Sequence, residues 1–272
     1  MENINNFSEN GYLVLKNALS KKLLKEINSQ IYKTILRKKT KNNYSSFALL
    51  TKNLKKSEFN FTKPIFERLF YKGLIEKILL EKKLYNIISN ILGKDLSFAI
   101  DPAITLNLPN KDNPKKNYLF KEWHQEIWSG ASTSSIQIWT PILQKQNDSA
   151  KLEIMINSHK WGHIPHRDRV PQELPKNYST KIIKLNYSDV IIFSTLLLHR
   201  SVKTTSPRIS LPLIIKNFKI TDNSYLQNRS WKIFSYSEIT KIERFLGNHY
   251  LSPFRISNIK TDLLSGTIKK FK

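Results

Sequence analysis

The chain has 272 residues, of which 40% are hydrophobic, and its 45 Lys and Arg against 21 Asp and Glu give a formal net charge of +24. This length and apolar content exclude a disordered chain and predict a single domain over residues 1–272. The lack of cysteine excludes disulfides and thiolate metal sites, so a metal would have to bind His and carboxylate side chains.

The charge and the N-terminal sequence bear on partners and location. An excess of positive charge favours anionic partners, namely nucleic acid, an anionic membrane surface or phosphorylated small molecules. The chain starts without a basic region followed by an apolar one, and it contains no apolar run of about 18 residues. We therefore expect a cytoplasmic protein without a transmembrane segment, and the oligomeric state stays open.

A short strand and a helix are predicted first. Residues 11–16 are an apolar run of strand-forming residues, and Ser20 can cap a helix whose apolar residues recur at helical spacing over residues 24–35. Residues 38–58 are rich in Lys, Asn and Ser, which predicts a loop able to reach over the mouth of the fold.

Two further helices follow in the same part of the chain. Thr62 with Pro64 predicts the start of a helix over residues 65–80. Residues 84–92 predict another, which should end at Gly93 because glycine readily adopts the left-handed conformation of a helix end. We expect these helices to form scaffold.

From residue 96 onward the pattern changes to that of strands. In residues 135–142, alternation places Gln137 and Trp139 on one face of a strand, so this face should line something polar. The predicted strands cover residues 97–100, 103–108, 135–142, 151–156, 182–185, 190–194 and 209–215, with polar loops at 109–116 and 165–180.

The order of these elements predicts the fold class. Helices first and many short strands afterwards, without regular alternation, predict an α+β protein with an antiparallel barrel or jelly roll. We expect a helical part over about residues 1–95, a β core over about 96–218, and a C-terminal helix and basic tail over about 219–272. Within the last part, residues 237–245 predict a capped helix, and residues 258–272 predict a mobile tail.

The sequence Trp123-His124-Gln125-Glu126 carries a chemical signal. In an extended strand, a His and a carboxylate two residues apart point the same way, so one further His brought in by folding completes a facial set of two imidazoles and one carboxylate. This set suits Fe(II), because it leaves coordination positions free for a bidentate co-substrate and dioxygen. By itself, the spacing is also compatible with a surface His beside a solvated acid.

Further motifs follow in order: Ile138-Trp139-Thr140-Pro141, residues 156–165, Ser188-Asp189-Val190-Ile191-Ile192-Phe193 and Leu198-His199-Arg200-Ser201. Together with residues 123–126, this succession resembles the phytanoyl-CoA dioxygenase family of iron- and 2-oxoglutarate-dependent oxygenases, over roughly residues 7–216. The resemblance implies a double-stranded β-helix in which His124, Glu126 and His199 hold Fe(II) at one open end.

The resemblance also implies residues for the co-substrate. Arg208, nine residues past His199, matches the 2-oxoglutarate-binding arginine of the family, and its planar fork suits a carboxylate. Ser210 could share that carboxylate. By family position, Trp139 lines the co-substrate pocket, with packing in the core as the alternative, and Asn107 lies where a polar strand residue often reaches 2-oxoglutarate.

Three departures from the family pattern are present. Glu126 stands where the family usually has Asp; the extra methylene changes the reach but keeps a carboxylate, so hydroxylation remains expected and the halogenating variants, which lack this ligand, are disfavoured. The turn at residues 156–159 departs from the usual Pro-Gly-Ser-His. The spacing from His199 to Arg208 is a little shorter than usual.

The remaining histidines predict no second metal site. His159, His163 and His166 are close in sequence, but their spacing does not place three side chains on one strand face. We expect His159 to make a structural contact in a turn, and His249 to lie at the surface.

The resemblance implies a dioxygenase that uses dioxygen and 2-oxoglutarate to hydroxylate a small molecule. Arg167, Arg169 and the net charge favour an anionic or carrier-linked substrate, for example a nucleotide- or lipid-linked sugar or an acyl thioester. Two alternatives stay open: a nucleic-acid demethylase, although basic residues are not interleaved with aromatic ones, and an inactive cupin-like binding protein, although all three ligands and Arg208 are kept.

Overall fold

The computed structural model describes residues 2–36, 61–101, 104–107, 122–145, 148–202, 206–220, 230–245, 259–261 and 268–270. The chain forms two compact units, Met1–Phe234 and Ser235–Lys272. The loops predicted at residues 38–58 and 109–116, and His249, lie outside the described residues. No helix within the described ranges is long and apolar enough to cross a membrane.

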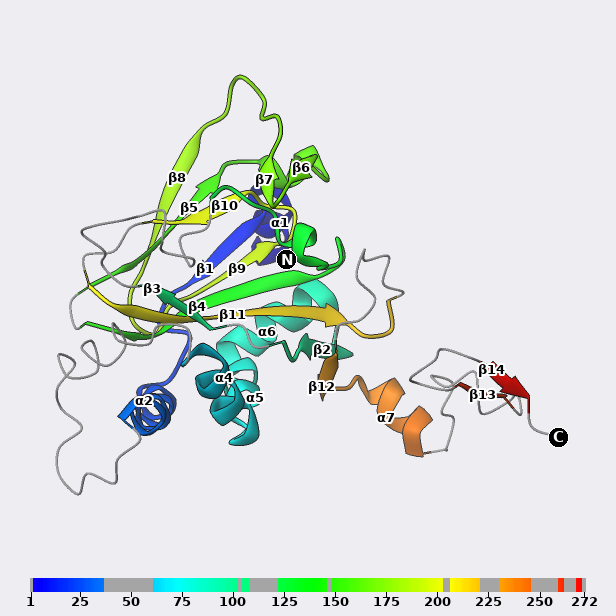
Figure 1. Ribbon diagram of the computed structural model, residues 1–272. Coiled ribbons are helices and arrows are strands. Elements are labelled where there is room, and N and C mark those ends of the chain that lie inside the picture. The colour runs from blue at the N-terminus through cyan, green and yellow to red at the C-terminus, as the bar shows by residue number, and fades with distance from the viewer. Residues whose placement is uncertain are drawn as a thin grey trace. The chain divides into compact units, whose positions relative to one another are not determined.

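The first unit begins with helices and one short strand. The Ser20 hydroxyl accepts a hydrogen bond from the Leu23 N–H at 3.3 Å, which confirms the predicted cap. Figure 1 shows these elements in blue and cyan. They are α1 (Glu2–Asn10), β1 (Tyr12–Leu15), α2 (Lys21–Leu36), α4 (Thr62–Tyr71), α5 (Leu74–Leu79) and α6 (Lys82–Leu92).

Two differences from the predicted helices have local causes. The helix predicted over residues 65–80 is broken into α4 and α5, because Gly73 adopts a left-handed conformation with φ 64° and interrupts the hydrogen-bond ladder. Helix α1 was not predicted, because its sequence is mostly polar; its Phe7 packs against the core. Gly93 ends α6 as predicted, with φ 82°.

The other described elements of the first unit are strands and the 3-10 turns η3 and η4. The predicted loop 165–180 contains a short hairpin, β6–β7, and β12 was not predicted. The elements are β2 (Leu96–Ala99), β3 (Thr105–Asn107), η3 (Glu126–Ser129), β4 (Ile136–Gln144), β5 (Ala150–Met155), η4 (Ser158–Trp161), β6 (His166–Arg167), β7 (Val170–Pro171), β8 (Thr180–Leu185), β9 (Val190–Ser194), β10 (His199–Ser201), β11 (Arg208–Asn217) and β12 (Trp231–Ser235).

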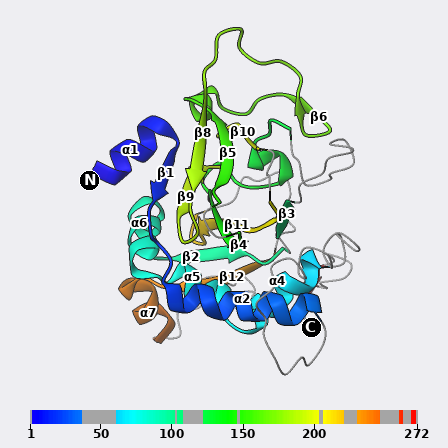
Figure 2. The ribbon, with the colours of Figure 1, turned by 90° about the vertical axis from the view of Figure 1, so that its left-hand side faces the viewer.

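Apart from the β6–β7 hairpin, the described strands of the first unit form two antiparallel sheets. The seven-stranded sheet has the order β1-β9-β4-β11-β2-β12, with β3 also paired to β11, and the three-stranded sheet has the order β10-β5-β8. Figures 1 and 2 show helices α2, α4, α5 and α6 on one side of the larger sheet and the smaller sheet on the other. This arrangement confirms the predicted α+β jelly roll with N-terminal helices.

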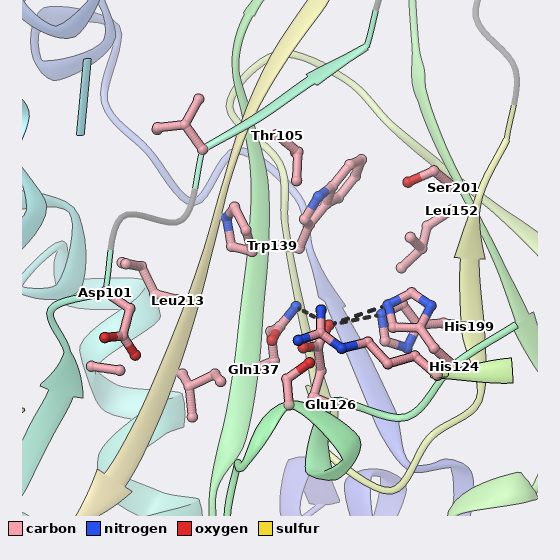
Figure 3. A pocket seen from close by; sticks show the side chains of 16 residues that line it. Asp101, Thr105, His124, Glu126, Gln137, Trp139, Leu152, His199, Ser201 and Leu213 are labelled. Atoms are coloured by element: carbon pink, nitrogen blue, oxygen red, sulfur yellow. Dashed lines mark hydrogen bonds and ion pairs between the residues drawn. The ribbon is translucent and has the colours of Figure 1, made fainter. Parts of the chain in front are cut away.

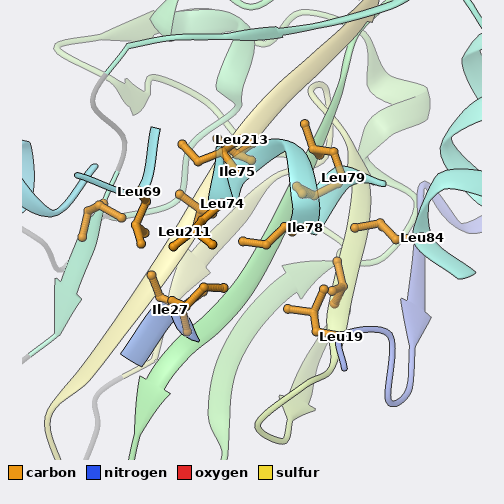
Figure 4. Close-up of a cluster of buried hydrophobic side chains, with 14 of the residues drawn as sticks. Leu19, Ile27, Leu69, Leu74, Ile75, Ile78, Leu79, Leu84, Leu211 and Leu213 are labelled. Atoms are coloured by element: carbon orange, nitrogen blue, oxygen red, sulfur yellow. The ribbon is translucent and has the colours of Figure 1, made fainter. Parts of the chain in front are cut away.

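The larger sheet is buried on both faces. Ile27 of α2, Leu69 of α4 and Ile75 of α5 belong to one cluster with Leu211 of β11 (Figure 4). On the other face, the two sheets enclose a second cluster that contains Trp139, Leu152, Ile191 and Phe193. Burial of each such side chain stabilises the fold by roughly 1.5–3 kcal/mol, and the inner face of β4 is thereby held in place.

The described residues of the second unit form a helix and a strand pair. Helix α7 (Glu238–Phe245) begins where the Ser237 hydroxyl accepts a hydrogen bond from the Thr240 N–H at 3.2 Å, and Gly247, which was expected to cap its C-terminal end, lies outside the described residues. In the predicted mobile tail, β13 (Ile259–Thr261) pairs with β14 (Ile268–Lys270). Both strands contain β-branched residues, which favour strand pairing.

Candidate active site

Two imidazoles and a carboxylate face one another inside the jelly roll. The Nε2 atoms of His199 and His124 lie 3.2 Å and 3.5 Å from Oε1 of Glu126. All three side chains are buried, and their ligand atoms lie within 4.8 Å of one another. Figure 3 shows the two rings directed at the carboxylate from one side. The structure thus brings together the three residues that the sequence predicted as metal ligands.

Main-chain carbonyl groups orient the two imidazole rings. Nδ1 of His124 lies 2.7 Å from the carbonyl oxygen of Glu122, and Nδ1 of His199 lies 2.9 Å from that of Leu197. Because a carbonyl oxygen only accepts, each Nδ1 carries a proton and donates it, which leaves the Nε2 lone pairs directed toward Glu126. Three acceptors that converge in this way repel one another unless a cation or a proton lies between them. The donor set therefore fits a metal ion.

The main chain sets the spacing of the two imidazoles. The N–H groups of His124 and His199 each donate to the carbonyl oxygen of the other residue at 3.1 Å. Gln125, which lies between His124 and Glu126 in the chain, is extended. The side chains of these two neighbours therefore leave the chain on the same side. The motif is not wholly a strand, however, because Glu126 begins η3 and its N–H donates to Thr195.

Gln125, the middle residue of the motif, is completely buried and joins three segments of main chain. Its Nε2 donates to the carbonyl oxygens of Gly162 at 2.8 Å and Leu196 at 2.6 Å, and its Oε1 accepts from the Ile164 N–H at 3.0 Å. Ile164 is buried, and Gly162 and Leu196 are partly buried, so these hydrogen bonds satisfy main-chain groups with limited access to water. Gln125 therefore fixes the turn that follows η4 and the turn that precedes β10.

Strand β4 orients the Glu126 carboxylate. Nε2 of Gln137 donates a hydrogen bond to Oε1 of Glu126 at 2.9 Å, the same oxygen that faces the imidazoles. Gln137 and Trp139 both line the site cavity, whereas Ile138 lies in the core on the helical side. The alternation predicted from the sequence is confirmed.

The site opens into a cavity of about 310 Å³, a volume that suits a small molecule. His124, Glu126 and His199 form part of its wall. Among the described residues, Arg169 of the β6–β7 turn is the one basic side chain of the wall besides these histidines. In Figure 3, Asp101 and Leu213 lie across the cavity from the two imidazoles. The other polar side chains of the wall are Thr105, Ser129 and Ser201.

Arg208 at the start of β11 is buried, with 3% of its surface exposed. Burial lowers the pKa of Arg208 to about 10, an effect that the Asp148 carboxylate opposes, so the guanidinium is still charged near neutral pH. Its Cζ lies 4.9 Å from the centroid of the Trp139 ring. Trp139 thus lies against the guanidinium, lines the cavity and packs in the core between the sheets.

Asn107 and Ser210 lie next to Arg208. Arg208 pairs with Asn107 across β11 and β3, which places both side chains on one face, and Ser210 is two residues along the same strand. Nε and Nη1 of Arg208, Nδ2 of Asn107 and Oγ of Ser210 are buried and have no hydrogen-bond partner within the described part of the chain. Such a concentration of unsatisfied polar atoms points to a ligand. These three residues are not part of the wall of the main cavity described above.

Of the other histidines, His159, His163 and His166 lie within the described residues. Nε2 of His159 lies 3.0 Å from the carbonyl oxygen of Ser8, the structural contact that was expected of this residue. His166 stacks on Trp128 with ring centroids 4.7 Å apart, and burial, followed by His163, lowers the pKa of His166. Within the ranges that the structure describes, one group of His and carboxylate side chains is placed so that it could hold a metal. Its members are the three predicted ligands, His124, Glu126 and His199.

Sequence reasoning missed the roles of two glutamines. Gln125 was quoted within the motif, but its contacts lie with residues that are distant in sequence, so no local signal could reveal them. Gln137 was placed on the same face as Trp139, and that alternation, combined with the predicted metal ligands, could have identified it.

The chain belongs to the phytanoyl-CoA dioxygenase (PhyH) family, whose model matches residues 7–210. Its class is therefore that of the non-haem, 2-oxoglutarate-dependent oxygenases, and the resemblance noted in the sequence is confirmed. No curated protein matches the chain significantly in sequence.

Solved structures with the same fold are similar to this chain at low sequence identity. The non-haem monooxygenase ThoJ in its apo form has a TM-score of 0.60 and 12% identity, with 87% of this chain and 84% of that chain covered. The non-haem α-ketoglutarate-dependent carbocyclase SnoK from nogalamycin biosynthesis has a TM-score of 0.52 and 10% identity, with 85% and 95% covered. The non-haem α-ketoglutarate-dependent epimerase SnoN from the same biosynthesis has a TM-score of 0.51 and 12% sequence identity, with 86% of this chain and 98% of that chain covered.

Proposed function

We propose that the protein is an Fe(II)- and 2-oxoglutarate-dependent hydroxylase of a small anionic or carrier-linked metabolite, and that His124, Glu126 and His199 bind the iron. The observation that carries this proposal is the convergence of two imidazole Nε2 atoms and one carboxylate oxygen within 4.8 Å on three buried side chains. Two imidazoles and one carboxylate on one side of a metal are the ligand set of non-haem Fe(II) oxygenases.

Arg208 is proposed to hold the distal carboxylate of 2-oxoglutarate. Its buried guanidinium has two nitrogens without a hydrogen-bond partner among the described residues, and carboxylate oxygens of a ligand would supply acceptors for them. Ser210 and Asn107 carry further unsatisfied donors on the same face and are proposed to share this ligand. Trp139, which packs against the guanidinium, would border the co-substrate.

The mechanism divides between the bound cofactor and the chain. When bound, Fe(II) with 2-oxoglutarate and dioxygen supplies the oxidant that attacks an unreactive C–H bond, with succinate and carbon dioxide as co-products. The carbonyl oxygens of Glu122 and Leu197 accept hydrogen bonds from Nδ1 of His124 and His199, which leaves the Nε2 atoms to bind the metal. The cavity walls orient one C–H bond of the substrate and exclude water.

Hydroxylation is proposed rather than halogenation because Glu126 keeps a carboxylate among the ligands, which the halogenating variants lack. The related structures are described as a monooxygenase, a carbocyclase and an epimerase, so this fold serves several outcomes. The outcome for this chain is tested by the mass of the product, which hydroxylation raises by one oxygen atom.

An anionic substrate is proposed from the charge near the cavity. Arg169 contributes to the cavity wall from the β6–β7 turn, and the chain carries a formal net charge of +24. A positive potential around a cleft raises the local concentration of anions. A panel of phosphorylated, acyl-thioester and neutral metabolites should therefore stimulate succinate release selectively for anionic members.

Two arginines of one hairpin make this substrate test specific. Arg169→Gln should weaken the stimulation by anionic metabolites, whereas Arg167→Gln, which changes the same charge outside the cavity wall, should not. Equal behaviour of the two variants would remove Arg169 from substrate binding. Stimulation by neutral metabolites alone would contradict the anionic class.

The cofactor assignment has a direct spectroscopic test. Under anaerobic conditions, protein with Fe(II) and 2-oxoglutarate should show the weak visible charge-transfer band of the chelate. After addition of oxygen, succinate should form. Iron binding without this band would remove 2-oxoglutarate from the proposed function.

A further inference from the structure

Glu126 is one methylene longer than the Asp that the family usually has at this position. A longer side chain has one more rotatable bond, so its carboxylate can occupy more positions. Nevertheless, a single oxygen of Glu126 faces both imidazoles, at 3.2 Å from Nε2 of His199 and 3.5 Å from Nε2 of His124. An additional contact is needed to select this position.

Gln137 provides that contact. Its Nε2 lies 2.9 Å from Oε1 of Glu126, and because a carboxylate only accepts, the amide nitrogen must be the atom that faces it. Both side chains are buried, with 4% and 5% of their surfaces exposed, so water competes little for this hydrogen bond. Figure 3 shows Gln137 reaching the carboxylate from β4, on the side away from the imidazoles.

The main chain holds the two residues at this distance. The Glu126 N–H donates to the carbonyl oxygen of Thr195 at 3.0 Å. The buried Thr195 hydroxyl in turn donates to Ser132 at 2.8 Å and lies 3.3 Å from the carbonyl oxygen of Ser135, directly before β4. The start of η3 and the start of β4 are therefore tied to the same residue.

We infer that Gln137 is the positioning residue for Glu126, and that the two side chains act as a pair. This inference rests on the proposed function, because it takes Glu126 as a metal ligand. Gln137 acts through Glu126, by holding Oε1 toward the imidazoles. In a Glu126→Asp variant the carboxylate would lie further from the Gln137 amide. Gln137 would then no longer orient the carboxylate toward the imidazoles.

The test measures Co(II) binding to the metal-free protein by calorimetry and by the visible absorption of bound Co(II). Gln137→Met removes the donor and keeps an unbranched side chain, and it should weaken Co(II) binding about 10- to 100-fold and shift the absorption band. Gln144→Met is the matched control, because it makes the same change on the same strand, where the amide donates to the Asp148 carbonyl. Its Co(II) affinity should be unchanged. Thermal unfolding checks that each variant is folded. If Gln137→Met is not folded, Gln137→Leu replaces it in the Co(II) binding test.

The second half of the test repeats the change in the Glu126→Asp background. There, loss of the Gln137 amide should alter Co(II) affinity less than about threefold, because the two side chains are no longer coupled. Unchanged affinity in the Glu126 background, or an equal loss in both backgrounds, would overturn the inference while the metal site stands. A wild-type protein that binds no Co(II) would overturn the proposed metal site and the inference with it.

Discussion

The inward face of the β barrel has two polar regions that differ in how their side chains are held. In the metal-facing region, carbonyl oxygens orient His124 and His199, and Gln137 orients Glu126. In the arginine region, Arg208 and Asn107 are buried with nitrogens that have no partner among the described residues. The protein itself organises the first region, whereas the second has donors that we propose a ligand satisfies.

This difference predicts opposite responses to substitution. Truncation in the organised region should leave buried groups without partners and cost stability or metal affinity. Removal of the Arg208 guanidinium should weaken 2-oxoglutarate binding. It should also raise the stability of the ligand-free protein, because a buried charge is removed. The following experiments test each side of the comparison, from the largest expected effect to the smallest.

His124→Ala and His199→Ala should abolish succinate formation, a loss of more than about a hundredfold, because each removes a proposed ligand rather than an outer partner. The fold should survive, since the hydrogen bonds between residues 124 and 199 use main-chain atoms. Succinate release and circular dichroism check the two statements. His159→Ala, outside the metal group, is the control and should keep activity; unfolding of both ligand variants would instead assign them a structural role.

Gln125→Leu should lower the free energy of unfolding by roughly 3 kcal/mol or more, because it leaves three main-chain groups without a partner at roughly 1–3 kcal/mol each. Urea unfolding measures the change. Gln172→Leu, an exposed glutamine, should change the free energy by no more than about 0.5 kcal/mol. Similar values for the two variants would show that Gln125 does not hold the metal-facing region together.

Arg208→Lys should weaken 2-oxoglutarate binding by about 10- to 100-fold, because loss of one charge-assisted hydrogen bond costs roughly 1.5–3 kcal/mol. Metal affinity should hardly change, since the metal-facing region is organised separately. Calorimetry with 2-oxoglutarate in the presence of Mn(II) measures the first value. Unaltered 2-oxoglutarate affinity would contradict the assignment of Arg208. Arg167→Lys, the same change at an exposed arginine, is the control and should leave this affinity unchanged.

Arg208→Met should raise the stability of the ligand-free protein by about 1 kcal/mol, because an apolar side chain replaces a buried charge. It should also remove the stabilisation that 2-oxoglutarate with Mn(II) gives the wild-type protein, which is about 2.7 kcal/mol at 100 times the dissociation constant. Thermal unfolding with and without ligand measures both. A less stable Arg208→Met variant would show that the guanidinium is already compensated in the free protein.

Much of the fold could be predicted from local patterns. The Ser20 cap, the end of α6 at Gly93 and the alternation of Gln137 and Trp139 each depend on residues within one element, and all three are confirmed. The break at Gly73 was missed because the apolar spacing continues across it, while the left-handed conformation of one residue ends the helix.

The candidate site could be predicted only in part. The set of His124, Glu126 and His199 and the position of Arg208 follow from motifs in the sequence. The contacts of Gln125 with residues 162, 164 and 196 follow from tertiary packing, and the shape of the cavity depends on side chains from many strands. Such long-range contacts leave no periodic trace in the sequence.

The pairing of β1 with β9 has a consequence for the folding rate. Tyr12 of the first strand lies opposite Phe193, so this pairing closes a loop over most of the first unit. The two imidazoles likewise come from residues 124 and 199. Because the entropy of closing long loops must be overcome before such contacts form, β-rich folds of this kind fold slowly. We expect the metal-binding residues to meet only late in folding, so that the unfolded chain offers iron no competing site of the same geometry.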